Sequence, residues 1–287
     1  MNVLSLFNGM NTGRQALENV GIKVNKYYSS EIKPYAIELT QHHFPDTIQV
    51  GDVTKWKEWD IDWKSIDLVL SGSPCQDLSA AGKRAGINGK KSSLFFTFVD
   101  ILNHIKELNP KVLFLQENVG SARKEDIGVM SRALGVYPVR INSSLVTAQL
   151  RDRYYWSNIR TKEDLMFEDI ITDIPQPKDK GIMFKDIITS GNVNRNKSKA
   201  LLERQSFTYK DKFSEKAQNF LVNREKFGMI LIYEKDFIRI PNKIEMCRLQ
   251  GFPDNYCDIL TTAKAGSLLG DGWTLPIIEH IFSFIKN

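Results

Sequence analysis

The sequence predicts an α/β fold, with a mostly parallel sheet covered by helices on both faces and a smaller second region. Short apolar runs typical of buried strands alternate with segments of helical periodicity along residues 1–160. Chemically distinctive residues come directly after those strands, at the edge where open α/β sheets bind ligands. Residues 161–236 are more polar and contain prolines, which predicts a small separate region before the closing segment.

The chain begins with a predicted strand, a glycine turn and a helix, in that order. Residues 2–6 suit a strand and residues 14–20 show helical periodicity, with Gly9 and Gly13 in the turn between them. Glycines let a ligand approach the backbone, and a helix N-terminus offers free N–H groups. The spacing Gly-x-x-x-Gly is not the Gly-x-Gly-x-x-Gly of dinucleotide sites. The turn therefore favours a nucleotide-type cofactor without a pyrophosphate and disfavours an NAD enzyme.

Two acidic residues follow the next predicted strands. Glu31 comes after a strand at 22–28, and a helix is expected at 34–43. An acid here can bind ribose hydroxyls or can begin the helix, and the spacing fits both interpretations equally. Asp52 ends a third short strand, where it can accept from an adenine amino group. The three tryptophans that follow are expected to pack in the core: Trp56, Trp59 and Trp63.

A cysteine follows the next buried strand. Residues 66–70 are an apolar run, and the glycine and proline after them predict a tight turn that places Cys75 at the rim of the sheet. A cysteine becomes a strong nucleophile once a neighbour lowers its pKa, so Cys75 is a candidate catalytic thiol. The alternative is a small buried residue in a turn. The glycine-rich, basic stretch 80–91 is typical of a loop that moves beside a site, and a helix is expected at 94–108.

A carboxylate and two arginines are predicted at the same rim. Glu117 ends the strand at 111–116; alone it suits a capping acid, but beside a rim cysteine it is a candidate acid whose pKa is raised by burial. Arg151 and Arg153 enter an aromatic, strand-like run, and residues two apart on a strand share a face. Both guanidinium groups are therefore expected in one cleft, with a surface ion-pair cluster around Asp152 as the alternative.

Composition excludes several classes of protein. The chain has 287 residues, of which 42% are hydrophobic and 25% charged, as is ordinary for a folded globular protein. Three cysteines, including Cys247 and Cys257, fit neither a disulfide framework nor a paired zinc spacing, so we expect no metal and a reducing, cytoplasmic environment. The first residues carry no basic leader and no run approaches about 18 apolar residues, so we expect neither secretion nor membrane insertion.

The positive charge of the chain is unevenly placed. The net charge of the chain is +5. Residues 178–226 hold 12 Lys or Arg and 6 Asp or Glu, and their net charge of +6 exceeds that of the whole chain. Such a localised basic surface suggests a polyanion partner, although a run of charge is also compatible with a plain solvated face.

Together, and in this order, these stretches resemble the DNA cytosine-C5 methyltransferases, most closely the branch that includes the vertebrate de novo enzymes. The resemblance covers nearly the whole chain except 161–236. The matching blocks are Phe7-Asn8-Gly9 with Gly13, Glu31, Asp52, Ser73-Pro74-Cys75, Glu117-Asn118-Val119, Arg151-Asp152-Arg153, Arg248-Leu249-Gln250-Gly251-Phe252-Pro253 and the stretch from Gly270 to Pro276.

The resemblance implies a Rossmann-like class I methyltransferase fold that uses S-adenosyl-L-methionine, releases S-adenosyl-L-homocysteine and methylates cytosine in double-stranded DNA. Carbon 5 of cytosine is a weak nucleophile, and a thiolate that adds at carbon 6 makes it an enamine. By resemblance Cys75 attacks, Glu117 donates to ring nitrogen 3, and Arg153 with Arg151 completes the polar rim. The base must be flipped out of the duplex, and the loop 80–91 would close over it.

The same resemblance assigns further site residues and a division of the chain. Residues 1–160 and 237–287 are expected to form the catalytic, cofactor-binding domain, and 161–236 a small target-recognition region. Pro74 and Asn118 join the catalytic set. The expected cofactor contacts are Phe7, Asn8, Gly9, Met10, Asn11, Thr12, Glu31, Ile32, Asp52, Val53, Pro74, Leu94, Asp271, Gly272 and Trp273.

Charge and position predict the contacts to DNA. Lysines of the basic segment, such as Lys212, would neutralise phosphates, whereas Asn194 and Asn196 with the nearby arginines have the geometry to read base edges. The alternative is that this segment is a solvated scaffold and that the loop from Lys83 to Lys91 reads the DNA. The predicted DNA-binding residues are Gln76, Ser79, Lys83, Arg84, Arg195, Lys197, Lys199 and Arg204.

Two departures and three rival functions accompany this interpretation. Asn8 stands where the family often has an acid, and Asp271 where many members have an asparagine. A tRNA cytosine methyltransferase is one rival, but the Cys-Phe-Thr signature of that branch is absent from the sequence. A catalytically silent DNA-binding relative is disfavoured because Cys75, Glu117 and Arg153 are all retained. A thiol hydrolase would need a histidine partner, and none of the four histidines lies in a recognisable motif.

Overall fold

A computed structural model describes residues 1–74, 94–164, 168–203 and 214–286. The chain divides into two compact units. The first unit holds Met1–Ile141, Asp152–Gln176 and Ile278–Asn287, and the second holds Asn142–Arg151 and Pro177–Ile277. The predicted recognition region therefore falls in both units, with 161–176 in the first and 177–236 in the second. None of the described helices is long and apolar enough to cross a membrane.

The first unit is built on a mostly parallel sheet. Among the described residues it has seven strands in the order β3-β2-β1-β4-β5-β8-β6, in which β3 to β5 run parallel and β8 runs antiparallel to β5. The chain order changes direction between β1 and β4, which is the switch point where such sheets bind ligands. The strands are β1 (Asn2–Leu6), β2 (Lys26–Ser30), β3 (Ile48–Gln49), β4 (Leu68–Ser71), β5 (Leu113–Val119), β6 (Val139–Asn142) and β8 (Asp152–Ser157).

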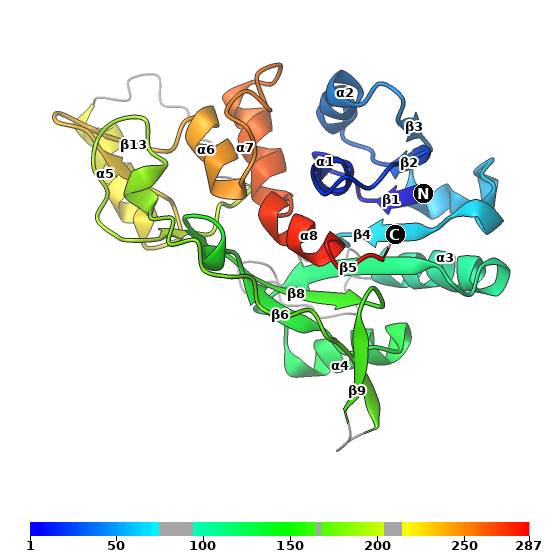
Figure 1. Cartoon of the computed structure of the whole chain (residues 1–287). Helices are drawn as coiled ribbons and strands as arrows, with labels where there is room; N and C mark the ends of the chain where they lie inside the picture. Colours follow the sequence, from blue (N-terminus) through cyan, green and yellow to red (C-terminus); the bar gives the residue numbers. More distant parts are fainter. Residues whose placement is uncertain (75–93, 165–167, 204–213, 287) are drawn as a thin grey trace. The chain divides into compact units, whose positions relative to one another are not determined.

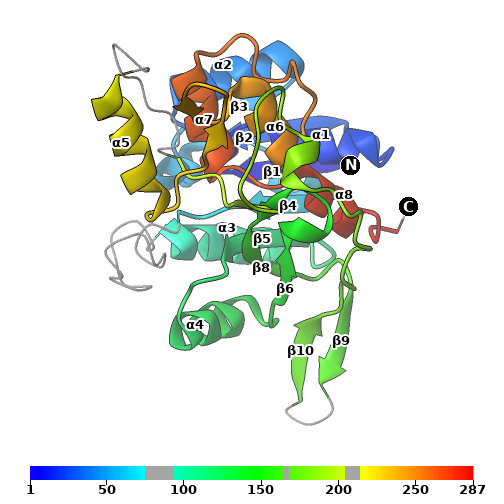
Figure 2. The same cartoon turned by 90° about the vertical axis from the view of Figure 1, so that its left-hand side faces the viewer.

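Helices cover both faces of this sheet, as the sequence predicted. Figures 1 and 2 show α1 and α2 on one side of β1 and β4, with α3 and α4 on the other. The strands β9 (Thr161–Asp164) and β10 (Asp169–Thr172) form an antiparallel hairpin in the same unit. The helices of this unit are α1 (Thr12–Asn19), α2 (Pro34–His43), α3 (Leu94–Leu108) and α4 (Lys124–Leu134), with the short helices η1 (Val53–Glu58) and η2 (Trp63–Ser65).

Helix α1 ends earlier than its periodicity suggests, and β2 begins later. Gly21 adopts a left-handed φ of +76°, and the N–H of Ile22 donates to the carbonyl of Leu17 at 2.9 Å. This is the closing turn of a helix, which a glycine adopts without steric cost. Residues 22–25 therefore belong to the exit from α1, and β2 starts at Lys26.

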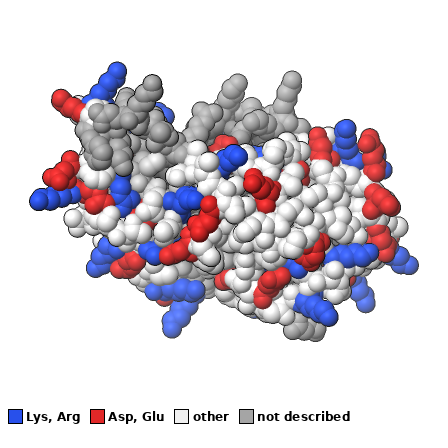
Figure 3. Space-filling view, turned by 90° about the horizontal axis from the view of Figure 1, so that it is seen from above, with Lys and Arg blue, Asp and Glu red and all other residues white. Residues whose placement is uncertain are grey.

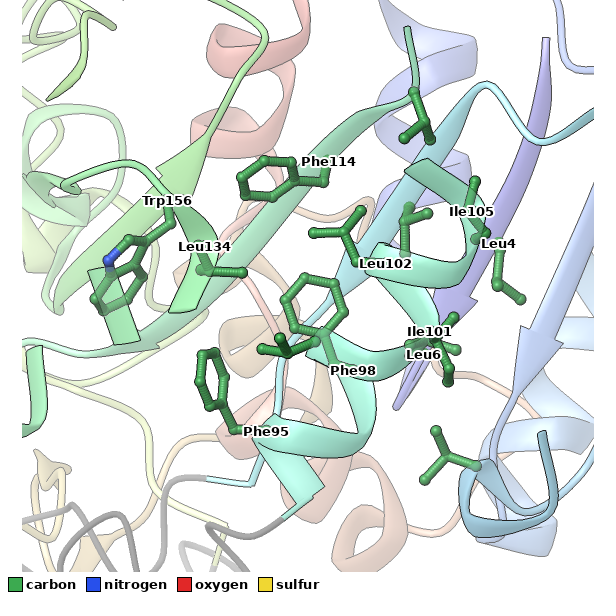
Figure 4. Close-up of a cluster of buried hydrophobic side chains, with 14 of the residues drawn as sticks. Leu4, Leu6, Phe95, Phe98, Ile101, Leu102, Ile105, Phe114, Leu134 and Trp156 are labelled. Carbon is green, nitrogen blue, oxygen red and sulfur yellow. The ribbon is translucent and has the colours of Figure 1, made fainter. Parts of the chain in front are cut away.

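The main core lies between the sheet and helix α3. Leu4 and Leu6 of β1 pack with Phe98 and Leu102 of α3, and Phe114 of β5 joins them (Figure 4). The alternation of Leu4 and Leu6 on one strand matches the period of two that a half-buried strand requires. The predicted packing role of the tryptophans is confirmed, because all three contact this core: Trp56, Trp59 and Trp63.

The second unit holds the remaining elements, each small. Leu221 of α5 packs on Met229 and Leu231 to form its own apolar cluster, and Cys247 on α6 is fully buried, as expected of a structural cysteine. Helix α8 (Leu275–Phe282) spans the division between the units. The elements are β7 (Gln149–Leu150), β11 (Ser198–Lys199), β12 (Ile232–Tyr233), β13 (Ile238–Arg239), α5 (Glu215–Glu225), α6 (Lys243–Gln250), α7 (Thr262–Asp271), η3 (Ser143–Leu145) and η4 (Phe184–Asp186).

Replacing Phe98 with alanine should destabilise the first unit strongly. Its ring is fully buried, so Phe98→Ala removes the transfer free energy and leaves a cavity, at a cost of about 3–5 kcal/mol. Phe96→Ala on the same helix is the matched control: its ring is 37% exposed, and the loss should stay below about 1 kcal/mol. Urea unfolding followed by tryptophan fluorescence measures both. Equal losses for the two variants would contradict this packing.

Candidate active site

The carboxyl ends of β4 and β5 are held together by a side chain. Ser71 pairs with Gln116 in the parallel ladder, and the Gln116 amide Nε2 donates to Ser73 Oγ at 2.9 Å. Gln116 and Ser73 are both buried. This hydrogen bond fixes Ser73, in the turn after β4, against Gln116, the residue that precedes Glu117 on β5. Cys75 itself lies outside the described residues.

Glu117 and Arg153 form an ion pair at this edge. Arg153 Nε lies 2.8 Å from Glu117 Oε1, and their side chains are 16% and 11% exposed. The strands explain the contact: Val119 of β5 stands opposite Arg153 of β8, so Glu117 lies two residues along the ladder, within diagonal reach of the arginine. Arg153 Nη1 also donates to the carbonyl of Asp152 at 2.8 Å. The structure thus brings together two of the predicted catalytic residues.

Asn118 is buried beside this pair. Its Oδ1 accepts from the N–H of Val119 at 2.8 Å, while its Nδ2 has no partner among the described residues. A buried amide donor left without a partner carries a desolvation cost of about 1–3 kcal/mol, so a ligand atom or a closing loop would satisfy it.

Arg151 does not share a cleft face with Arg153 in the way that the two-residue spacing predicted. Its guanidinium is buried and donates to the carbonyls of Leu201, Gly270 and Gly272 at 2.8–2.9 Å, all within the second unit. The reason is local: β7 ends at Leu150 and β8 begins at Asp152, so Arg151 lies between two strands and the period of two is interrupted there.

Glu31 fastens the glycine turn to the start of α2. Its Oε2 accepts from the N–H of Gly9 at 2.7 Å, and its Oε1 accepts from the N–H groups of Ile32 and Lys33 at 2.8 and 2.9 Å. The N–H groups of Ile32 and Lys33 both precede α2, which begins at Pro34, so the carboxylate joins the segment before α2 to the turn after β1, and its contact with ribose stays a prediction. Ile32 is 70% exposed beside it, which leaves an apolar side chain available to cover a flat ligand.

The turn after β1 has features that suit a polar ligand. Phe7, Gly9 and Asn11 all have left-handed φ angles, of 56°, 58° and 63°. Asn11 is fully buried at the N-terminus of α1, and neither of its side-chain amide atoms has a hydrogen-bond partner among the described residues. The buried residues Met10 and Thr12 flank it. A cofactor that reached this turn would meet an unsatisfied donor and acceptor and the first N–H groups of a helix.

The side-chain amide of Asn8 makes hydrogen bonds within the protein. Its Nδ2 donates to Thr40 Oγ1 and its Oδ1 accepts from the Tyr27 hydroxyl, each at 3.3 Å. Burial raises the pKa of Tyr27, so the phenol stays a donor. The amide of Asn8 thus joins β2 to α2, and a carboxylate at this position could not donate to Thr40 Oγ1.

The third acidic residue, Asp52, caps a short helix. Its Oδ1 accepts from the N–H and the hydroxyl of Thr54, both at 2.9 Å, and the backbone N–H lowers the pKa of Asp52. Val53 beside it is buried, and Leu94, at the start of α3, packs on the main core. Asp52 and Glu31 follow adjacent strands, so two ionisable acceptors stand at neighbouring carboxyl ends of the sheet.

The closing residues of the predicted cofactor site belong to the second unit. Helix α7 ends at Asp271, and the carbonyl of Gly272 accepts from Arg151 and from Gln250. The predicted cofactor contacts of Asp271, Gly272 and Trp273 stay predictions.

Two predicted DNA contacts are engaged within the second unit. Lys197 Nζ donates to the carbonyls of Ser144, Thr147 and Ile182 at 2.5–3.1 Å, and Lys199 Nζ donates to the carbonyl of Glu225. Contact of Lys197 with a phosphate would require one of its three bonds to open, because an ammonium group has three donors. On the face that Figure 3 draws, basic and acidic side chains are interspersed over the described residues. Six further predicted contacts lie outside the described residues: Gln76, Ser79, Lys83, Arg84, Arg204 and Lys212.

The sheet order, the ligand-type turn after β1 and the acids after β2 and β3 define a Rossmann-like protein of the methyltransferase class. The chain belongs to the C-5 cytosine-specific DNA methylase family, whose model matches residues 1–231. The predicted family and fold class are therefore confirmed.

Several named relatives support this assignment. Orphan methyltransferase M.SPRI of Bacillus phage SPR is 35% identical over 181 residues, which are 58% of this chain and 39% of the phage protein. Type II methyltransferase M.NlaIV of Neisseria lactamica is 31% identical over 66% of this chain and 48% of its own length. This chain thus spans less than half the length of these two relatives. Type II methyltransferase M1.ScrFI of Lactococcus lactis subsp. cremoris is 29% identical, over 97% of this chain and 76% of its own length.

Solved structures share the fold. The S. pombe Dnmt2 methyltransferase superposes with a TM-score of 0.64 at 16% identity and covers 99% of this chain and 98% of its own. The Entamoeba histolytica methyltransferase EhMeth gives a TM-score of 0.63 at 15% identity and covers 100% and 99%. At these identities the likeness concerns the fold.

Removing Arg153 alone from its ion pair with Glu117 should lower the free energy of unfolding more than removing both charges. Arg153→Met leaves a nearly buried carboxylate without its cation, and the unfolding free energy should fall by about 3–5 kcal/mol. The double variant Arg153→Met with Glu117→Gln should recover part of this loss. Arg140→Met is the control, since its pair with Asp152 is 55% and 31% exposed and is worth about 1 kcal/mol or less. Urea unfolding of the three variants measures these losses. A loss of unfolding free energy for Arg140→Met as large as that for Arg153→Met would contradict the burial of the pair.

Proposed function

We propose that this protein transfers a methyl group from S-adenosyl-L-methionine to carbon 5 of a cytosine flipped out of double-stranded DNA. The observation that supports the proposal is the edge of β4 and β5, where Gln116 bonds Ser73, two residues before Cys75, and the next residue of β5, Glu117, pairs with Arg153. A nucleophile, a carboxyl group and a guanidinium at one sheet edge are what addition to carbon 6 of the ring requires.

The chain's own residues divide the chemistry between them. The thiolate of Cys75 adds to carbon 6, which makes carbon 5 nucleophilic. Once carbon 5 carries the methyl group, solvent water accepts the proton from carbon 5, the double bond between carbons 5 and 6 re-forms and the thiolate leaves. Glu117 binds the ring at nitrogen 3. The proposal requires Glu117 to carry a proton when the base is bound, so that its carboxyl group donates to nitrogen 3. Arg153 then holds the carboxyl group in position beside the base.

The turn after β1 fits the proposed cofactor. When bound, S-adenosyl-L-methionine would supply the electrophilic methyl group. Asn11 offers its unsatisfied amide and the N-terminus of α1 its N–H groups, Glu31 lies at the same turn, and the exposed Ile32 can cover a purine face. Asp52 remains an acceptor because its pKa is lowered by Thr54.

Double-stranded DNA is the proposed substrate, and the region 161–236 the proposed reader of its sequence, so the enzyme would act wherever in the cell the DNA is. The relatives at 29–35% identity are named as orphan and type II methyltransferases, which agrees with a DNA substrate. Labelled methyl transfer to a DNA duplex, compared with transfer to tRNA, tests the choice directly. Transfer to tRNA alone would replace this proposal with its rival.

Replacing the nucleophile should abolish turnover without unfolding the protein. Cys75→Ser puts a hydroxyl where a thiolate must attack, and a hydroxyl is a far poorer nucleophile near neutral pH. We expect no measurable methyl transfer, with cofactor binding by calorimetry retained. Conversely, wild-type protein should form a covalent adduct with a duplex that carries 5-fluorocytosine, detected by its shift on a denaturing gel. Absence of that adduct with cofactor and target present would refute the mechanism.

Glu117→Gln should keep binding but lose most of the rate. The amide still donates a hydrogen bond to nitrogen 3 but cannot pass a proton, and loss of one such group typically costs about 10²–10³-fold in rate. Single-turnover methyl transfer gives the rate, and calorimetry with cofactor and DNA gives the two affinities. A near-normal rate would remove Glu117 from the reaction.

A further inference from the structure

A cluster in the second unit holds one arginine in a fixed orientation. Arg195 Nη2 donates to Glu225 Oε1 at 2.8 Å, and Arg195 Nε donates to Asn194 Oδ1 at 3.2 Å. Asn194 Nδ2 in turn donates to Glu225 Oε1 and to the Tyr233 hydroxyl oxygen, each at 3.1 Å. Hydrogen bonds from Asn194 and Arg195 lower the pKa of Glu225, so this carboxylate is the ionised centre of the cluster.

The backbone that carries Arg195 is anchored at both ends. Asn192 exchanges two backbone hydrogen bonds with Tyr233 of β12, at 2.8 and 2.9 Å, and the carbonyl of Asn196 accepts from the N–H of Phe184 at 2.7 Å. Gly191 makes the approach to β12 possible: its φ is +79°, and a Cβ there would lie 2.8 Å from the carbonyl oxygen of Tyr233. Arg195 therefore extends from a short segment of fixed backbone. Ordering its side chain on binding then costs little conformational entropy.

The cluster uses one edge of the guanidinium and leaves another available. Nε and Nη2 are engaged, whereas Nη1 makes no hydrogen bond to any residue that the structure describes. The Arg195 side chain is 33% exposed, and it lines a hollow of about 620 Å³ formed by the segment 183–196. The Nη1 and Nη2 edge thus offers two parallel N–H donors beside an open surface.

Charge decides between the two DNA groups that such an edge can bind. A phosphate is attracted by net positive charge, but Glu225 neutralises Arg195 at 2.8 Å, which weakens that attraction. Neutralisation leaves the geometry of the two donors unchanged, and two parallel N–H donors match the O6 and N7 acceptors of guanine in the major groove. Adenine presents a donor at the position of O6 and is rejected.

We infer that Arg195, held by Glu225 and Asn194, reads one guanine of the target sequence through its Nη1 and Nη2 edge. The inference rests on the proposed function, because it assigns the specificity of the same enzyme. It also changes the predicted role of Asn194 from a base reader to a residue that positions Arg195. Helix α5, which ends at Glu225, supplies the carboxylate, and Figure 1 shows this helix beside β13.

The test begins with the methylated motif of the wild type, sequenced by a method sensitive to 5-methylcytosine after expression in cells. Arg195→Lys replaces the planar pair of parallel donors with a single ammonium group that Asn194 and Glu225 no longer hold in the same orientation, and we expect one guanine position of the motif to relax, with discrimination there falling about 10–100-fold. Glu225→Gln should relax the same position and no other, because it releases the arginine. Arg224→Lys is the control, since Arg224 lies over the rings of Phe220 and Phe227, and its motif should be unchanged.

A second measurement needs no variant. Wild-type protein is assayed on duplexes in which each guanine of the motif in turn is replaced by 7-deazaguanine, which lacks N7, or by hypoxanthine, which keeps O6 and N7. At the position that Arg195 reads, 7-deazaguanine should lower kcat/KM about 10-fold, and hypoxanthine should leave it near normal. The Arg195→Lys variant should no longer respond to 7-deazaguanine there.

The outcomes are separable from those of the proposed function. If the wild type methylates no DNA, the proposed function fails and no motif exists to be read. If it methylates DNA and Arg195→Lys keeps the full motif, the inference is overturned. Equal weakening on all sequences with a salt slope reduced by about 1 would make Arg195 a phosphate contact, which also overturns it. If Arg195→Lys fails to fold, the response of the wild type to 7-deazaguanine decides.

Discussion

The parallel pairing of β1, β4 and β5 is the constraint on which the site depends. Residues in register along these strands end at one edge, so Ser71 stands beside Gln116 and the turns that follow the strands become neighbours. Chemistry that needs groups from distant parts of the sequence is thereby assembled by backbone hydrogen bonds, whose geometry is independent of the side chains. The hydrogen bond from Gln116 to Ser73 adds a side-chain contact in the turn after β4, two residues before Cys75.

Much of this arrangement could be predicted from the sequence because its signals are local. Helices at 34–43 and 94–108 were expected at the residues where the structure has them, since Pro34 suits a first helical position and Pro110 prevents a longer helix. Strand β5 runs further than predicted, to Val119, because its last residues pair with β8. That pairing joins residues more than 30 positions apart, and no local pattern announces it.

The site residues that sequence reasoning missed have long-range partners. Glu225 and Tyr233 have no motif, and their importance follows from contacts with Asn194 and Arg195 about 30–40 residues away. Arg151 was assigned to the cleft from its spacing, whereas its partners lie 50 to 121 residues further along the chain. Arg151 was recognised as chemically significant and Glu225 and Tyr233 were not singled out, and only the fold decided what each of them contacts.

The contacts of Arg151 bear on how freely the segment that it holds can vary in sequence. Its acceptors in Leu201, Gly270 and Gly272 are main-chain carbonyls, and Gln149 and Gln250 likewise bind the carbonyls of Leu249, Leu269 and Gly272. Every residue has a main-chain carbonyl whatever its side chain. Residues around Leu201 can therefore be substituted while the segment keeps its hydrogen bond to the buried guanidinium of Arg151. The attachment thus makes no demand on the side chains of that segment, so its sequence can vary while its backbone stays in place.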